Sequence, residues 1–192
     1  MEPVSLSVDE LVLRPWRDDD AEALCAAAQD PLLRRWNGEE ATTLDGARAR
    51  LARIAGWTAE HCSWAVEDGG VLVGSLSLHE IDRVQDEGEV GYWTVAAARG
   101  RGIAARCTDA VCRWGFSALE LDRVQLFHAV GNTASARVAV KAGFTQEGRL
   151  RRSYRYPDGM KHDELLWSRL SDDPPPRGGL ERPPPWGPRS AR

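Results

Sequence analysis

The feature that most constrains this chain is a strand-like run followed by a glycine-containing loop and a long amphipathic segment. Residues 88–95 alternate as a β-strand does, residues 99–102 read Arg-Gly-Arg-Gly, and residues 103–119 carry apolar side chains at helical spacing. The first N–H groups of a helix have no partner within it, and the helix dipole places roughly half a positive charge there. The run therefore predicts a site for a phosphate or pyrophosphate at the start of the helix.

The loop residues fit such a site, although they do not prove it. Gly100 and Gly102 permit positive φ angles and remove side chains that would hold an anion away from the backbone. Arg99 and Arg101 add cationic donors. A glycine pair before a helix is also typical of a tight turn, so the loop alone leaves both interpretations open. The chain has no Gly-Lys-Ser/Thr of a P-loop, and no Gly-x-Gly-x-x-Gly follows an early strand.

A second polar element follows the next predicted strand, residues 123–130. Asn132 and Ser135 open a short helix over residues 134–142. Ligands of parallel sheets bind beyond the carboxyl ends of the strands, so we expect Asn132 and the glycine loop to face one crevice. Helix capping is an equally good interpretation of Asn132 and Ser135.

The remaining pattern predicts an α+β domain of three layers. Further strands are expected at 10–16, 63–67, 71–80 and 165–170, with helices at 18–28 and from 43 onward. Hairpins are antiparallel, whereas the crossover through 103–119 should join parallel strands, so the sheet is mixed. We expect residues 9–170 to form the domain and the proline-rich residues 171–192 to form a disordered tail.

Two motifs in order, EVGYW…RGRGIA and N-x-x-S-x-R-V-x-x-K-x-GF, resemble the GNAT superfamily of acetyl-CoA-dependent acyltransferases. The resemblance is greatest to the RimJ/RimL-like ribosomal-protein alanine N-acetyltransferases and extends over about residues 9–170. The superfamily motif Gln/Arg-x-x-Gly-x-Gly/Ala is met by Arg99, Gly102 and Ala104. The resemblance implies a GNAT-like α/β/α domain with a splayed central sheet.

The same resemblance implies where acetyl-CoA binds. Backbone N–H groups of the loop and the first helical turn would hold the pyrophosphate, and the preceding strand would pair with the pantetheine amides. The residues expected to bind the cofactor are Trp93, Val95, Arg99, Gly100, Arg101, Gly102, Ile103, Ala104, Ala105 and Asn132. No metal is implied.

The catalytic candidates are Glu89 and Ser135. Glu89, at the start of the strand, would take a proton from the amine directly or through water, although an exposed carboxylate at a strand edge is an equally good interpretation. A backbone N–H of residues 93–95 would stabilise the oxyanion. Many relatives place a tyrosine at the position of Ala139 to protonate the thiolate. Here Ser135 resembles the serine of the RimJ/RimL-like subgroup, and an ordered water is the competing donor.

The composition limits the kinds of partner that the chain is expected to bind. The formal net charge of −4 argues against a nucleic-acid partner, and every apolar run is too short to span a bilayer. The four cysteines have no spacing typical of a zinc site. The first residues carry no pattern typical of a secretory signal, so we expect a cytoplasmic protein. The oligomeric state is left open between a monomer and a homodimer.

The acceptor is the least constrained part of the prediction. The leading hypothesis is acetylation of a protein or peptide α-amine, and the alternative is a small-molecule amine such as an antibiotic, a polyamine or an amino acid. A coenzyme A-binding module without catalysis is a third interpretation. The acceptor cleft is expected between residues 30–57, including Trp36, and the hairpin 153–162. His79 and Glu80 are further candidates to face the acceptor, because their strand neighbours that of Glu89.

Overall fold

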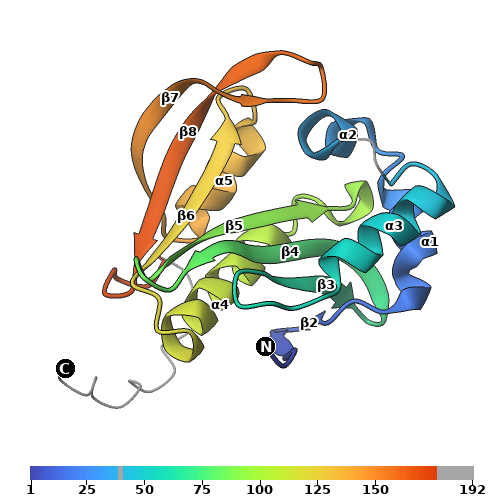
Figure 1. The fold of residues 1–192 in the computed structure, drawn as a ribbon, viewed down its shortest axis with the longest axis horizontal. Coiled ribbons are helices and arrows are strands. Elements are labelled where there is room, and N and C mark those ends of the chain that lie inside the picture. The colour runs from blue at the N-terminus through green and yellow to red at the C-terminus, as the bar shows by residue number, and fades with distance from the viewer. Residues whose placement is uncertain (39–40, 177–192) are drawn as a thin grey trace.

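The protein, described by a computed structural model over residues 1–38 and 41–176, is a mixed sheet with helices on both faces (Figure 1). The strands are β1 (Leu6–Val8), β2 (Leu11–Arg14), β3 (Cys62–Asp68), β4 (Val71–Asp82), β5 (Glu87–Thr94), β6 (Arg123–Ala129), β7 (Thr145–Arg155) and β8 (Lys161–Leu170). The helices are α1 (Ala21–Ala27), α2 (Pro31–Asn37), α3 (Leu44–Ile54), α4 (Ile103–Ala118) and α5 (Thr133–Lys141), with short 3-10 turns at Asp18–Asp20 and Ala96–Ala98. The α+β class is confirmed. Most of the predicted tail, from residue 177 on, lies outside the described residues, so the domain boundary stays a prediction.

The sheet is open between its two halves. Its strand order is β1-β2-β3-β4-β5-β6-β8-β7, and β5 with β6 is the parallel pair of the described sheet. These two strands are in register only from Glu87 with Arg123 to Glu89 with Gln125, after which they diverge (Figure 1). The splayed mixed sheet is therefore confirmed, and main-chain groups of both strands beyond Glu89 face a gap.

Each face of the sheet has its own apolar core. On one face, α4 packs Ile103, Cys107 and Val111 against strand residues such as Leu78 and Val90. On the other face, the cluster is built from Trp16, Leu24, Leu51 and neighbouring side chains of α1 and α3. The three predicted layers are thereby confirmed, and β5 is held between both cores where it approaches the gap.

Two elements differ from the sequence expectation. The predicted strand 10–16 contains β2, and the prediction missed β1, which pairs with β2 in a hairpin whose turn contains Asp9 at φ 53°, so no glycine marks it. The connection around Trp36 is the helix α2, with Asp30 as its N-cap and Pro31 in its first turn. The helix has 7 residues, and its apolar side chains Leu32, Leu33 and Trp36 are too few to establish a helical period from sequence. The sequence analysis did not predict this helix.

No helix in the described part of the chain is both long and apolar enough to cross a bilayer.

The close approach of β4 and β5 requires a glycine at position 74. A Cβ built at Gly74 would lie 2.5 Å from the carbonyl oxygen of Trp93, whereas one at Gly88 would meet no atom closer than 3.4 Å. Because the obstacle is backbone, we expect Gly74→Ala to lower the free energy of unfolding by about 1–3 kcal/mol, as overpacking does. Urea unfolding measures this, with Gly88→Ala as the matched control. Equal stability of the two variants would contradict the close approach of β4 and β5.

Candidate active site

The N-terminus of α4 carries unpaired main-chain donors. Gly102 is its N-cap at φ 75° and makes no side-chain capping bond, while Asp30, Thr43 and Asn132 cap α2, α3 and α5. A Cβ at Gly102 would meet no atom within 4 Å, so the space in front of the helix is open. The loop is therefore able to present the first N–H groups of α4 to an anion.

The gap between β5 and β6 exposes one set of β5 main-chain groups. Val95 donates its N–H to Val73 in the neighbouring strand at 3.0 Å. Since hydrogen-bonding groups alternate between the two sides of a strand, Trp93 also faces β4, and Val90, Tyr92 and Thr94 face the gap. Within the predicted stretch 93–95, Thr94 is thus the residue whose N–H can reach an oxyanion. The roles of Trp93 and Val95 in holding the cofactor stay predictions.

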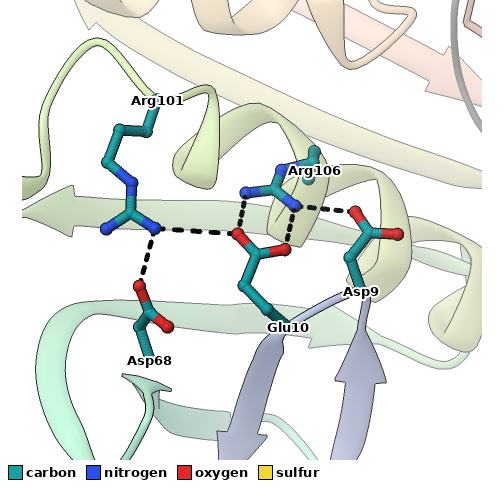
Figure 2. Close-up of polar contacts among 5 residues, drawn as sticks. All are labelled: Asp9, Glu10, Asp68, Arg101 and Arg106. Atoms are coloured by element: carbon teal, nitrogen blue, oxygen red, sulfur yellow. Dashed lines mark hydrogen bonds and ion pairs between the residues drawn. The ribbon is translucent and has the colours of Figure 1, made fainter.

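Figure 2 shows that the side chain of Arg101 turns toward carboxylates. Its Nη2 lies 2.6 Å from Oδ2 of Asp68 and 3.7 Å from Oε1 of Glu10. Arg106, in the first turn of α4, holds Glu10 at 2.8 Å and Asp9 at 2.7 Å. The hydrogen bonds from Arg106 lower the pKa of Glu10 to about 2. The network ties the β1–β2 turn and the β3–β4 hairpin to the start of α4.

Arg99 is engaged in the same manner. Its guanidinium pairs with Asp30 of the α2 N-cap, and its Nε donates to the carbonyl of Thr94 at 3.2 Å. Burial favours the neutral form of Asp30, but hydrogen bonds from the Leu32 N–H and from Arg99 outweigh it and lower its pKa. Arg99 and Arg101 are thus both ion-paired in this structure, their role as cationic donors to the cofactor stays a prediction, and the main-chain N–H groups are the donors that the loop leaves open.

Glu89 lies where β5 and β6 begin to diverge. It is the cross-strand partner of His79, whose Nε2 is 3.5 Å from Oε1 of Glu89, and the two side chains are about a third exposed. Ser77 contacts the other ring nitrogen of His79 at 3.3 Å. A Cβ at Gly91 would come within 3.2 Å of the imidazole, so the glycine leaves room for the ring. Glu80 lies where the register of β4 and β5 shifts, between His79 and Asp82. It is exposed and takes no part in the contact between His79 and Glu89.

The first turn of α5 forms the opposite side of the gap. The side chain of Asn132 accepts a hydrogen bond from the N–H of Ser135 at 3.2 Å, so Asn132 caps the helix. The hydroxyl of Tyr92 reaches across from β5 to the carbonyl of Ser135 at 3.5 Å. Burial raises the pKa of Tyr92 to about 12. The sequence prediction missed Tyr92, although its alternation with Val90 placed it on the α4–α5 face.

A cleft of about 360 Å³ lies at the carboxyl end of β6. Its floor is Ala129–Gly131, its walls come from α2 and from the β7–β8 hairpin, and Trp36 meets Tyr156 edge-on at 5.7 Å. Arg35, Trp36 and the hairpin residues from Tyr156 to His162 fall within the ranges predicted for the acceptor cleft, whereas Arg149, Arg152 and Asp163 lie outside them. The floor directly precedes Asn132, so the cleft adjoins the gap between β5 and β6. Among the described residues, no group of side chains has the arrangement of a metal site.

An extended thioester that carries a pyrophosphate suits these features, because its phosphates can meet the start of α4 while its amide-bearing arm follows β5. The class defined by fold and site is therefore that of transferases that use an acyl-coenzyme A.

Comparison with known proteins agrees. The family model described as the acetyltransferase (GNAT) domain matches residues 10–145. YoaA of Bacillus subtilis, an N-acetyltransferase, is 31% identical over 168 residues, which cover 85% of this chain and 94% of YoaA. YdaF of Bacillus subtilis is 39% identical over 101 residues, covering 53% of this chain and 55% of YdaF. The structure of RimL in complex with coenzyme A superimposes with a TM-score of 0.80 at 20% identity, covering 87% of this chain and 98% of RimL.

The chain belongs to the GNAT acetyltransferase family, and it is an acetyl-CoA-dependent N-acetyltransferase. The predicted membership is confirmed, and the likeness to RimL confirms the fold expected of a RimJ/RimL-like protein.

Proposed function

We propose that this protein transfers the acetyl group of acetyl-CoA to the N-terminal α-amine of a protein or peptide. The observation that carries the proposal is the cleft between α2 and the β7–β8 hairpin, whose floor leads directly to Asn132 and the first turn of α5 with Ser135. A chain end that enters it from the surface would bring its amine toward the gap between β5 and β6. Two relatives support a protein acceptor by name: YdaF is named, provisionally, as a ribosomal N-acetyltransferase, and RimL is a ribosomal L7/L12 alpha-N-protein acetyltransferase.

The residues present fit acetyl-CoA as a co-substrate. The N–H groups of Ile103, Ala104 and Ala105 would hold its pyrophosphate at the uncapped start of α4, together with the loop backbone at Gly100 and Gly102. The gap-facing groups of Val90, Tyr92 and Thr94 would pair with its amides. Acetyl-CoA supplies an activated thioester carbonyl, and the chain must orient that carbonyl and move protons.

Glu89 is the proposed general base. An amine attacks only in its neutral form, so Glu89 takes the proton directly or through a water as nitrogen bonds to the carbonyl carbon. The Thr94 N–H would stabilise the negative charge that develops on the carbonyl oxygen. The carbon–sulfur bond then breaks, its electron pair leaves on sulfur, and the thiolate takes up a proton.

Ser135 is the proposed proton donor to the thiolate, with an ordered water as the alternative. Ala139 is fully buried and has no acidic group. Tyr92 is close to Ser135, but its hydroxyl proton is directed to the carbonyl of Ser135 at 3.5 Å. Ser135 and the ordered water remain the two proposed donors.

The test is release of free thiol from acetyl-CoA against two panels, one of peptides with free N-termini and one of small-molecule amines. The matched control is each peptide with its N-terminus blocked and an internal lysine retained. We expect release with the free peptides and mass-spectrometric addition of one acetyl group at the α-amine. Release with small amines alone would overturn the peptide acceptor, and release with neither panel would contradict catalysis of these reactions.

A further inference from the structure

The cleft between α2 and the β7–β8 hairpin has an excess of positive charge. Its lining holds four permanently basic side chains, Arg35, Arg149, Arg152 and Lys161, against the two carboxylates Asp158 and Asp163. The whole chain, in contrast, has a formal net charge of −4. The cationic surface is therefore local to the cleft and does not follow from the composition.

Both carboxylates of the cleft are already engaged. Asp163 accepts the backbone N–H of Arg152 and the Nε of Arg149, each at 2.8 Å, and these contacts lower its pKa. Asp158 accepts the N–H of Met160 at 2.9 Å and lies 2.6 Å from Nε2 of His162. Asp158 also interacts electrostatically with Arg35, yet the four basic side chains still outnumber the two carboxylates of the lining.

Three of the basic side chains are available to an incoming group. Within the described chain, no carboxylate lies at ion-pair distance from the side-chain nitrogens of Arg35, Arg152 or Lys161. Arg35 comes from the α2 wall, whereas Arg152 and Lys161 come from the paired strands β7 and β8 of the other wall. An extended chain in the cleft would pass between the two walls.

The backbone is shaped to place Arg152 there. Arg152 has φ 49°, a left-handed conformation that costs energy for a residue with a side chain, and the β7–β8 register shifts between Leu150 and Tyr154. Its N–H bond to Asp163 holds this bulge. A bulge redirects side chains relative to the regular strand, and here residue 152 joins the cleft lining while Arg151 does not.

The walls that carry these cations are held by hydrogen bonds and aromatic contacts. The hydroxyl of Tyr156 donates to Glu164 at 2.9 Å, and Ser153 donates to the other oxygen of the same carboxylate at 2.8 Å. On α2, the guanidinium of Arg35 lies 4.6 Å from the ring centre of Trp36, which contacts Tyr156. The cations are thus presented on a preorganised surface.

We propose that the acceptor is acidic: a protein or peptide whose first residues after the acetylated amine carry carboxylates, bound by Arg35, Arg152 and Lys161. This inference rests on the proposed function and specifies its substrate class. A guanidinium fork matches the two oxygens of a carboxylate. The cations lie on three elements, a spacing that suits successive side chains of an extended peptide better than one compact phosphate.

Two peptides of identical length test the inference, one with aspartate and glutamate as its second and third residues and one with asparagine and glutamine there. We expect kcat/KM to be about tenfold higher for the acidic peptide, mainly through a lower KM, because each exposed ion pair contributes only a modest binding free energy. The ratio between the two peptides should shrink as the salt concentration is raised, because salt screens exposed charges. A phosphate-bearing small-molecule amine is the third substrate.

Substitutions of the cleft residues test whether these basic side chains cause the preference for the acidic peptide. The triple variant Arg35→Gln, Arg152→Gln and Lys161→Gln should use both peptides equally while retaining its affinity for acetyl-CoA. Arg152→Gln alone should reduce the preference, whereas its matched control Arg151→Gln, which removes one charge beside the cleft, should keep it. Equal use of the two peptides by the unmodified protein, or a preference that survives the triple variant, would overturn the acidic acceptor and leave the proposed function standing. Turnover of the phosphate-bearing amine without turnover of any peptide would overturn both.

Discussion

Replacing Glu89 with glutamine is expected to lower kcat by about 100-fold, within the range attributed to general base catalysis. Glutamine keeps the shape of the side chain but cannot accept the amine proton. The affinity for acetyl-CoA should change little, because Glu89 lies at the start of the gap and away from the α4 N-terminus. Steady-state kinetics with a peptide acceptor and calorimetry with acetyl-CoA measure the two quantities separately.

Glu80→Gln is the matched control, since Glu80 is an exposed carboxylate next to His79 but outside its contact with Glu89. It should retain kcat. The pH profile adds a second readout: the rate should fall at low pH as the amine becomes protonated, and Glu89→Gln should change the shape of that profile as well as the rate. Equal turnover of Glu89→Gln and the unmodified protein at every pH would exclude Glu89 as the base.

Replacing Gly102 with tryptophan is expected to weaken acetyl-CoA binding by about 10- to 100-fold. The indole would occupy the open space in front of α4 and keep the pyrophosphate from one or more N–H groups, and each hydrogen bond to a charged group contributes about 1.5–3 kcal/mol. Calorimetric titration with acetyl-CoA measures the loss.

The variant Gly159→Trp serves as a control that separates the loss of a binding site from the effect of backbone strain. Gly159 has φ 77°, against 75° for Gly102, and a Cβ at either position would meet no atom within 4 Å. The two substitutions therefore carry similar strain, but Gly159 lies in the β7–β8 turn. Unchanged acetyl-CoA affinity in a folded Gly102→Trp variant would contradict pyrophosphate binding at the start of α4.

The fold was predictable wherever local signals decide it. Gly100 and Gly102 mark the loop before α4, Thr43 caps α3 as its position suggested, and the two hairpins turn at glycines. The splay of β5 from β6 followed from a resemblance and not from the residues themselves, because strand divergence depends on packing between distant elements.

The missed elements lack such signals. The β1–β2 turn uses Asp9 in a left-handed conformation, for which aspartate is far less diagnostic than glycine. The helix α2 has an Asp30-Pro31 start and Gly38 at its end, so its caps were present, but its 7 residues are too short a stretch to establish the apolar spacing used to find helices.

Within the site, the positions of Glu89 and the glycine loop could be predicted because each adjoins a recognisable strand or helix end. The partners of Arg99 and Arg101 could not, since Asp30 and Asp68 are distant in sequence and only the tertiary fold brings them close. The cationic cleft was hidden for the same reason: its basic residues come from α2 and the β7–β8 hairpin.

The most direct test of acetyl transfer at this site is a single calorimetric titration of the full chain with acetyl-CoA, followed in the same sample by addition of a peptide with a free N-terminus and measurement of released thiol. We expect saturable binding with a Kd in roughly the micromolar-to-millimolar range typical of enzyme substrates, then release of thiol that depends on the peptide. Absence of acetyl-CoA binding by the folded protein would contradict the central claim.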